Sequence, residues 1–174
     1  IEATPVKSGE TLCIGERTLT FVTTPMVHWP DNMVTYSDVD KILFSNDAFG
    51  QHFASTKRFD DENDLCEVYK QAKKYYANIV WPYGMQAKKA LDVVRTLDLK
   101  MIAPSHGVIW RSHIADILDK YEAWTTYQTV DKAVVVFDSM WHSTESMARE
   151  ITDAFIKEGI TAELCGKTRP THFR

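Results

Sequence analysis

Residues 132–138, KAVVVFD, and residues 139–145, SMWHSTE, decide the fold of the second part of this chain. The first stretch is a short apolar run rich in valine, which predicts a buried β-strand. The second stretch is a turn rich in hydroxyl groups, and an amphipathic helix is predicted after it over residues 146–158. A strand, a turn and a helix in this order, with one more strand after them, indicate the start of a parallel α/β domain.

The turn between this strand and this helix predicts an anion site. Backbone N–H groups in the first turn of a helix have no partner inside the helix, and the helix dipole favours negative charge there. The turn contains no glycine, so it matches neither the G-x-G-x-x-G nor the Walker pattern. Hydroxyls in place of glycines favour a terminal phosphate monoester, such as that of flavin mononucleotide (FMN), over a pyrophosphate.

The composition excludes several classes of function. The chain has 174 residues and a net charge of −4, so it has no basic footprint for nucleic acid. No apolar run is long enough to span a bilayer. Its three cysteines, Cys13, Cys66 and Cys165, are far apart and odd in number, which argues against a disulfide framework and a cysteine-ligated metal. We therefore expect a cytoplasmic protein with no nucleic-acid partner and no membrane partner.

Apolar patterns predict the elements of the first part of the chain. Strands are expected at residues 11–14, 17–23, 41–45 and 100–103. Helices are expected at residues 62–80, 85–97 and 112–127. Pro82 should end the first helix, because the residue before a proline avoids helical angles. A short polar segment at residues 125–131 indicates a boundary, so that residues 1–130 and 131–174 form two α/β-type domains.

Three side chains that can bind a metal follow predicted strands. His28 comes after residues 21–27, Asp47 after residues 42–46, and His106 after residues 101–105. Loops at the carboxyl ends of strands converge on one crevice, so we expect these side chains to lie close together. Two imidazoles and a carboxylate suit iron, zinc or manganese. Each residue alone is more simply explained as a turn or packed loop residue, so the prediction depends on their shared position.

Four sequence motifs resemble those of the flavodiiron proteins, also called A-type flavoproteins. They are residues 24–31 (TPMVHWPD), 45–51 (SNDAFGQ), 104–108 (PSHGV) and 138–145 (DSMWHSTE). The last motif is most similar to the rubredoxin:oxygen oxidoreductase branch. The resemblance covers nearly the whole chain in the right order, up to about Cys165.

This resemblance implies a fold and a set of site residues. The fold is of the α/β (α+β) class, with the C-terminal part of a metallo-β-lactamase-like αββα domain before the start of a flavodoxin-like doubly wound domain. The first domain would hold two non-haem irons, with His28 as a ligand of one iron, Asp47 as the bridging carboxylate and His106 as a ligand of the other. The FMN phosphate would lie against residues 139–144, which are Ser139, Met140, Trp141, His142, Ser143 and Thr144.

The resemblance also implies an activity and partners. Electrons would pass from FMN to the di-iron centre, which would reduce dioxygen to water, nitric oxide to nitrous oxide, or both. A rubredoxin-like protein would donate the electrons, and the enzyme would be a head-to-tail homodimer or a homotetramer. Two other interpretations stay open, namely a metallohydrolase of the lactamase-like fold and a flavodoxin-like electron carrier. A hydrolase does not explain residues 139–145, and a carrier does not explain three ligands after three strands.

The sequence departs from the family pattern in two respects. The H-x-E-x-D-H motif that supplies the other iron ligands is absent, and a flavodoxin fold needs five strands. We therefore expect an internal fragment of a longer polypeptide, which alone would be inactive.

Overall fold

The computed structural model describes residues 4–166 of the chain. Contacts divide the chain into two compact units, Ile1–Gln128 and Thr129–Arg174, and each is described by itself. None of the helices in the described range is long and apolar enough to cross a membrane.

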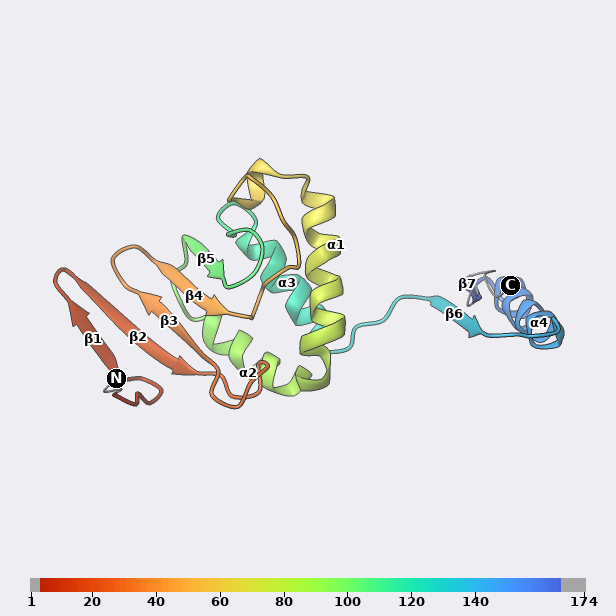
Figure 1. Cartoon of the computed structure of the whole chain (residues 1–174), viewed down its shortest axis with the longest axis horizontal. Helices are drawn as coiled ribbons and strands as arrows, with labels where there is room; N and C mark the ends of the chain where they lie inside the picture. Colours follow the sequence, from red (N-terminus) through yellow and green to blue (C-terminus); the bar gives the residue numbers. More distant parts are fainter. Residues whose placement is uncertain (1–3, 167–174) are drawn as a thin grey trace, which may run out of the picture. The chain divides into compact units, whose positions relative to one another are not determined.

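The first unit is built on a mixed five-stranded sheet (Figure 1). The sheet has the order β1-β2-β3-β4-β5, in which β1 to β4 are antiparallel neighbours and β5 is parallel to β4. A turn at Gly15, with φ of +74°, joins the first two strands. The strands are β1 (Thr11–Ile14), β2 (Arg17–Thr23), β3 (Met33–Ser37), β4 (Ile42–Asn46) and β5 (Met101–Pro104).

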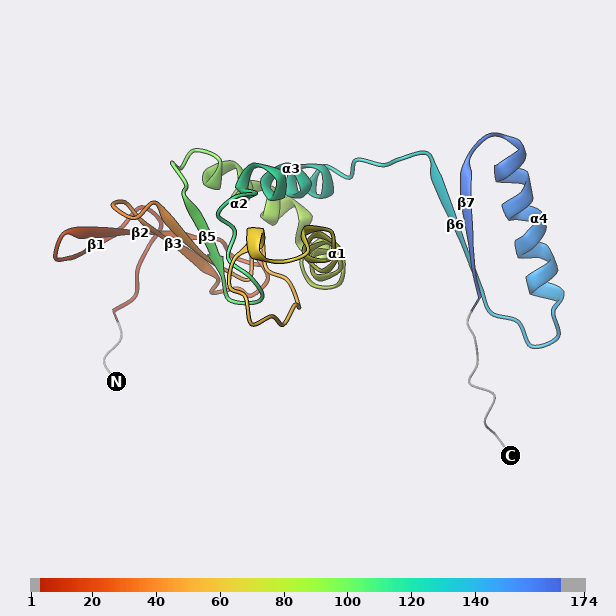
Figure 2. The ribbon, with the colours of Figure 1, turned by 90° about the horizontal axis from the view of Figure 1, so that it is seen from above.

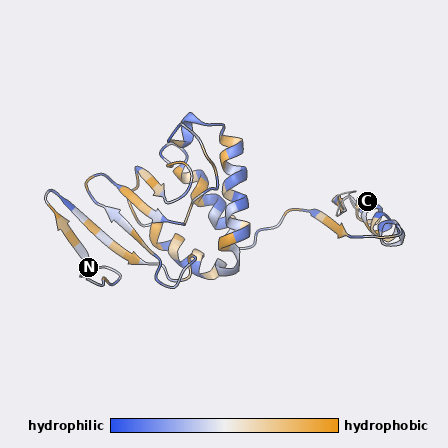
Figure 3. Cartoon of the chain, viewed as in Figure 1, coloured by the Kyte–Doolittle hydropathy of each residue, from blue (hydrophilic) through white to orange (hydrophobic). Residues whose placement is uncertain are grey.

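Helices cover only part of this sheet. They are η1 (Asp60–Glu62), α1 (Leu65–Tyr75), η2 (Tyr76–Val80), η3 (Trp81–Tyr83), α2 (Gly84–Val94) and α3 (Ile114–Thr125). Both ribbon views show β1 and much of β2 extending away from α1 and α3 (Figures 1 and 2). Apolar residues lie along these two strands (Figure 3), and Leu12 and Ile14 are about half exposed. The core therefore lies between the helices and the β3–β5 side of the sheet.

The long helical segment differs from the prediction. The α1 helix begins after Asp64, whose carboxylate accepts the backbone N–H of Cys66 at 3.0 Å and so caps the first turn. Pro82 does not end the helical path, since it lies at the start of the short 3₁₀ helix η3, where a backbone N–H is not needed. Most of the predicted helix over residues 62–80 is therefore an α-helix followed by a π-helical turn, and the 3₁₀ turn η3 continues from it.

The strand β3 was not predicted. Its two buried residues are Val34 and Ser37, and their spacing does not follow the alternation of a half-buried strand. The hydroxyl of Ser37 is satisfied by the carboxylate of Asp40 at 3.1 Å, which lets a polar residue be buried there.

The second unit is a β-α-β segment made of β6 (Lys132–Phe137), α4 (Ser143–Lys157) and β7 (Thr161–Gly166). The two strands are parallel, with Lys132 opposite Thr161. The helix begins three residues earlier than predicted. Its buried residues are Ala148 and Thr152, whereas four large apolar residues are exposed, namely Met147, Ile151, Phe155 and Ile156.

Candidate metal centre

The structure brings His28, Asp47 and His106 together beyond the carboxyl end of β4. The Nε2 atom of His28 lies 3.4 Å from Oδ2 of Asp47, and the Nε2 atom of His106 lies 3.3 Å from Oδ1 of the same carboxylate. The side chain of Asp47 is 11% exposed, that of His28 is 29% exposed and that of His106 is 51% exposed. A nearly buried carboxylate therefore lies between two imidazoles that remain reachable from solvent.

The arrangement provides two pairs of donor atoms. Two ligand atoms that share one ion, with bonds of about 2.1 Å and angles between tetrahedral and octahedral, lie roughly 3.0–3.4 Å apart. Each histidine has this spacing to a different oxygen of Asp47. In the range 4–166, no three His, Cys, Asp or Glu side chains are grouped as a set for a single ion. The chemistry of the donors thus fits two neighbouring ions that share Asp47, with each ion needing further ligands.

Four polar side chains, of which Thr24 and Asn32 are buried and Asn46 and Ser105 are exposed, hold the three loops in register. The side-chain NH₂ group of Asn32 donates to Oγ1 of Thr24 at 2.6 Å, and the side-chain oxygen of Asn32 accepts from the side-chain NH₂ group of Asn46. The carbonyl oxygen of Asn46 in turn accepts the hydroxyl of Ser105 at 3.1 Å. Residues of the loops that carry His28, Asp47 and His106 are thus joined in one chain of hydrogen bonds. Asn32 and Thr24 were not predicted as site residues, although Thr24 begins the motif at residues 24–31.

The segment after Asp47 is a tight, buried turn. Phe49 has a positive φ of 65°, an uncommon conformation for an aromatic residue, and it is 2% exposed. Its backbone N–H donates to the hydroxyl of Tyr121 at 2.8 Å, and its carbonyl accepts Nε1–H of Trp110 at 2.8 Å. These two hydrogen bonds hold the backbone of Phe49 in its positive-φ conformation, so that the turn after Asp47 is rigid.

The side chain of Tyr75 lies beside the carboxylate of Asp47. The ring of Tyr75 lies 6.0 Å from that of His106 and 4.8 Å from that of His52, measured between centroids. Burial raises the pKa of Tyr75, and the charge of Asp47 and a hydrogen bond to it raise it further. The phenol therefore stays protonated and can donate a hydrogen bond toward Asp47. The sequence did not predict this contact, because it cannot show which end of a buried tyrosine faces a site.

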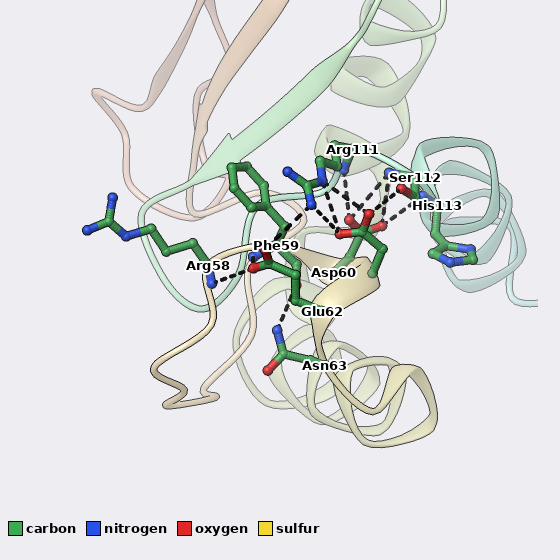
Figure 4. Close-up of polar contacts among 9 residues, drawn as sticks. Arg58, Phe59, Asp60, Glu62, Asn63, Arg111, Ser112 and His113 are labelled. Carbon is green, nitrogen blue, oxygen red and sulfur yellow. Dashed lines mark hydrogen bonds and ion pairs between the residues drawn. The ribbon is translucent and has the colours of Figure 1, made fainter.

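A second carboxylate anchors the loop that follows His106 (Figure 4). Asp60 is fully buried, and its two oxygens accept the backbone N–H groups of Arg111 at 3.0 Å, Ser112 at 3.2–3.3 Å and His113 at 2.7 Å. These amides lead into the N-terminus of α3, where negative charge is stabilised. The sequence explains Asp60 by the dipole of the helix that follows it, whereas the structure pairs it with α3, more than 50 residues away.

The predicted phosphate turn precedes α4. Ser139 to His142 form the turn, and Ser143 and Thr144 are the first two residues of the helix. His142 has a positive φ of 66°, and its Nδ1 pairs with the carboxylate of Glu145 at 2.8 Å. Within residues 4–166, no recorded hydrogen bond uses the backbone N–H groups of residues 139–145. These amides are thus available as anion donors, as the phosphate prediction requires.

Comparisons with known proteins identify a family. The family model described as "ODP family beta lactamase" matches residues 2–107. The chain is 44% identical over 163 residues to the nitric oxide reductase of Moorella thermoacetica, covering 92% of this chain and 41% of that protein. Curated relatives such as this one are thus spanned over about 40% of their length.

Solved structures give the same result. The rubredoxin oxygen:oxidoreductase of Desulfovibrio gigas superposes with a TM-score of 0.89 at 41% identity, over 94% of this chain and 42% of that one. The flavodiiron protein of Giardia intestinalis superposes with a TM-score of 0.87 at 41% identity, over 92% of this chain and 40% of that one. The chain therefore belongs to the flavodiiron proteins, and residues 2–107 match their β-lactamase-like part.

Proposed function

We propose that His28, Asp47 and His106 supply part of a di-iron centre in which Asp47 bridges the two irons. One observation carries this proposal, namely that two imidazoles approach different oxygens of a single carboxylate at 3.3–3.4 Å. A carboxylate has two oxygens with which to span two ions, and imidazole with carboxylate is a donor set that iron accepts. Further ligands would come from outside this set of three residues.

The residues around the centre have defined tasks in this proposal. Asp47 keeps its two oxygens fixed because the turn that follows it is locked by Tyr121 and Trp110. Tyr75 stays protonated and holds a proton next to Asp47. The bound irons would supply electrons and open coordination positions for a diatomic substrate. The exposure of His28 and His106 leaves a path by which such a substrate can reach the site.

We propose further that residues 139–144 bind the phosphate of FMN. The unused amides at the start of α4 and the hydroxyls of Ser139, Ser143 and Thr144 support this site. Met140 and Trp141 are largely exposed, at 65% and 82%, and are free to contact the flavin. The carboxylate of Glu145, in the first turn of α4, is paired with His142 and Arg149, which offsets its repulsion of a phosphate at the helix end.

The proposed activity is that of a flavodiiron oxidoreductase acting on dioxygen, nitric oxide or both. Reduction of one O₂ to two waters takes four electrons and four protons, and reduction of two NO to N₂O and water takes two of each. Similar proteins are named nitric oxide reductase and rubredoxin oxygen:oxidoreductase, which supports both substrates and a rubredoxin-like electron donor. These names favour an oxidoreductase over a metallohydrolase or a simple flavodoxin-like carrier. We place the enzyme in the cytoplasm, as a homodimer or a homotetramer.

Turnover of the native protein tests the proposal. Reduced rubredoxin is mixed with the purified protein under anaerobic conditions, and O₂ or NO consumption is followed with an electrode. The expected result is consumption that depends on bound FMN and iron and that is lost in Asp47→Ala. Exposed Asp92→Ala on α2 is the matched control and should retain the rate. A flavin-free protein that hydrolyses esters would instead support the metallohydrolase.

A further inference from the structure

Gln51 is a buried polar residue for which the proposed centre has no direct use. Its side chain is fully buried in the loop that follows Asp47. The side-chain oxygen Oε1 of Gln51 accepts the backbone N–H of Val108 at 2.7 Å. The side-chain nitrogen Nε2 donates to the backbone carbonyls of Phe49 at 3.0 Å and Val108 at 3.4 Å. One side chain therefore joins the loop that carries Asp47 to the loop that carries His106.

The backbone of both loops makes further hydrogen bonds beside this contact and leaves space for the Gln51 side chain. The N–H of Gln51 donates to the carbonyl of His106 at 3.1 Å, and the N–H of Gly50 donates to the carbonyl of Asp47 at 3.2 Å. Gly107 has a φ of +87°, and a Cβ at this position would lie 2.0 Å from the side-chain oxygen of Gln51. A long amide at position 51 and a glycine at position 107 are therefore required together.

We propose that Gln51 is a positioning residue that sets the distance between His106 and Oδ1 of Asp47. The side chain of His106 is half exposed and packs only on one side, against Tyr75 and His52, so its place also depends on the position of its backbone. The carbonyl of His106 accepts the backbone N–H of Gln51, a bond that any residue at position 51 keeps, so the side chain of Gln51 acts on His106 through Val108, two residues later. Gln51 acts on the metal only through these residues.

The effect on the two metal positions is unequal. Within the described residues, the hydrogen bonds of Gln51 run to residues 49, 106 and 108, and none runs to the loop of His28. That loop is held separately, through Asn32 and Thr24. Loss of the Gln51 contacts should therefore weaken the ion between His106 and Asp47 and spare the ion between His28 and Asp47. A residue that served stability alone would affect both ions equally.

This inference rests on the proposed di-iron centre, and its test is iron release from the native protein. Iron-loaded wild type, Gln51→Met and Gln51→Glu are mixed with a ferrous chelator, and the coloured complex is followed with time. Met has a similar length but no hydrogen bonds, whereas Glu keeps an acceptor for the N–H of Val108. Ser37→Ala is the matched control, because Ser37 is a buried polar residue in β3 that pairs with Ile42, at the end of β4 remote from Asp47.

The expected result is release in two phases for Gln51→Met, with one iron leaving about 10- to 100-fold faster than in wild type and the other unchanged. Gln51→Glu should accelerate the same phase, because it keeps the acceptor for Val108 but sets an oxygen against the carbonyls of Phe49 and Val108, and it serves alone if the Met variant does not fold. Unchanged release, or equal acceleration of both irons, would overturn the role of Gln51 while leaving the centre in place. Wild-type protein without iron would overturn the proposed centre itself.

Discussion

Replacing Asp60 removes the anchor between the His106 loop and the N-terminus of α3 (Figure 4). Its carboxylate makes four hydrogen bonds to three successive backbone N–H groups, those of Arg111, Ser112 and His113. Asp60→Ala leaves all three amides without a protein partner, and each lost bond to a charged group costs about 1–1.5 kcal/mol when water can partly replace it. The expected loss in the free energy of unfolding is therefore about 3–4 kcal/mol.

Asp60→Asn separates the shape of this side chain from its charge. The carbonyl oxygen of asparagine can still accept two amides, whereas its NH₂ group faces the third N–H and repels it. About half of the loss expected for Asp60→Ala, roughly 2 kcal/mol, should follow. Urea unfolding followed by tryptophan fluorescence measures both values, with the fully buried Trp110, next to Arg111, as a reporter.

Asp61→Ala is the matched control for this pair of variants. Asp61 is the next residue in η1, and it forms an ion pair with the guanidinium of Arg111 at 3.0 Å on the surface. Exposed pairs of this kind contribute little to stability. A loss for Asp60→Ala no greater than that for Asp61→Ala would refute the view that buried amide contacts, and not surface charge, hold this loop.

Three further changes have defined outcomes. Tyr76→Phe should raise the free energy of unfolding by up to about 1 kcal/mol, because the buried Tyr76 hydroxyl has no hydrogen-bond partner among the described residues. Urea unfolding measures this change, and a fall of similar size in the free energy of unfolding would contradict the prediction. Burial raises the pKa of Tyr76 from 10.0 to about 12 and also raises that of Tyr121, so these phenols stay protonated in the folded state. The stability that depends on these protonated phenols is fully present below pH 10 and is lost as the pH rises toward 12. The urea midpoint should therefore fall over this interval, and a constant midpoint would contradict the raised pKa values. Asn32→Ala should cost about 1–3 kcal/mol, since it leaves the buried Oγ1 of Thr24 without its donor, whereas the exposed Asn78→Ala should cost far less. Equal urea midpoints for the two variants would show that the Asn32 network does not hold the loops.

Local patterns predicted the elements whose signals are local. The strands at residues 11–14 and 17–23 were predicted with the bounds that the structure has, because a positive-φ glycine turn and β-branched residues mark them. β3 was missed because a buried serine, satisfied by Asp40, breaks its alternation. Pro82 was misread because the pattern does not show that a proline is tolerated at the start of a 3₁₀ turn.

In the site as well, positions set by the local sequence were predicted, and contacts between distant residues were not. The position of His28, Asp47 and His106 after three strands predicted that they would lie together, and the distances of 3.3–3.4 Å agree with that expectation. The residues that hold them were not predictable, since Gln51 depends on Val108, which is 57 positions away. Contacts of this kind depend on tertiary folding, and a single sequence carries no periodicity that reports them.

The iron content of the native protein, measured beside Asp47→Ala, tests the central claim most directly. Elemental analysis of wild type should give about two irons per chain, with a separation of roughly 3.5–4 Å by X-ray absorption, as in two-metal sites. Asp47→Ala should lose both irons, because both oxygens of this carboxylate are used, whereas the exposed Asp92→Ala should keep them. An Asp47→Ala protein that retains one or both irons would contradict a bridging role for Asp47.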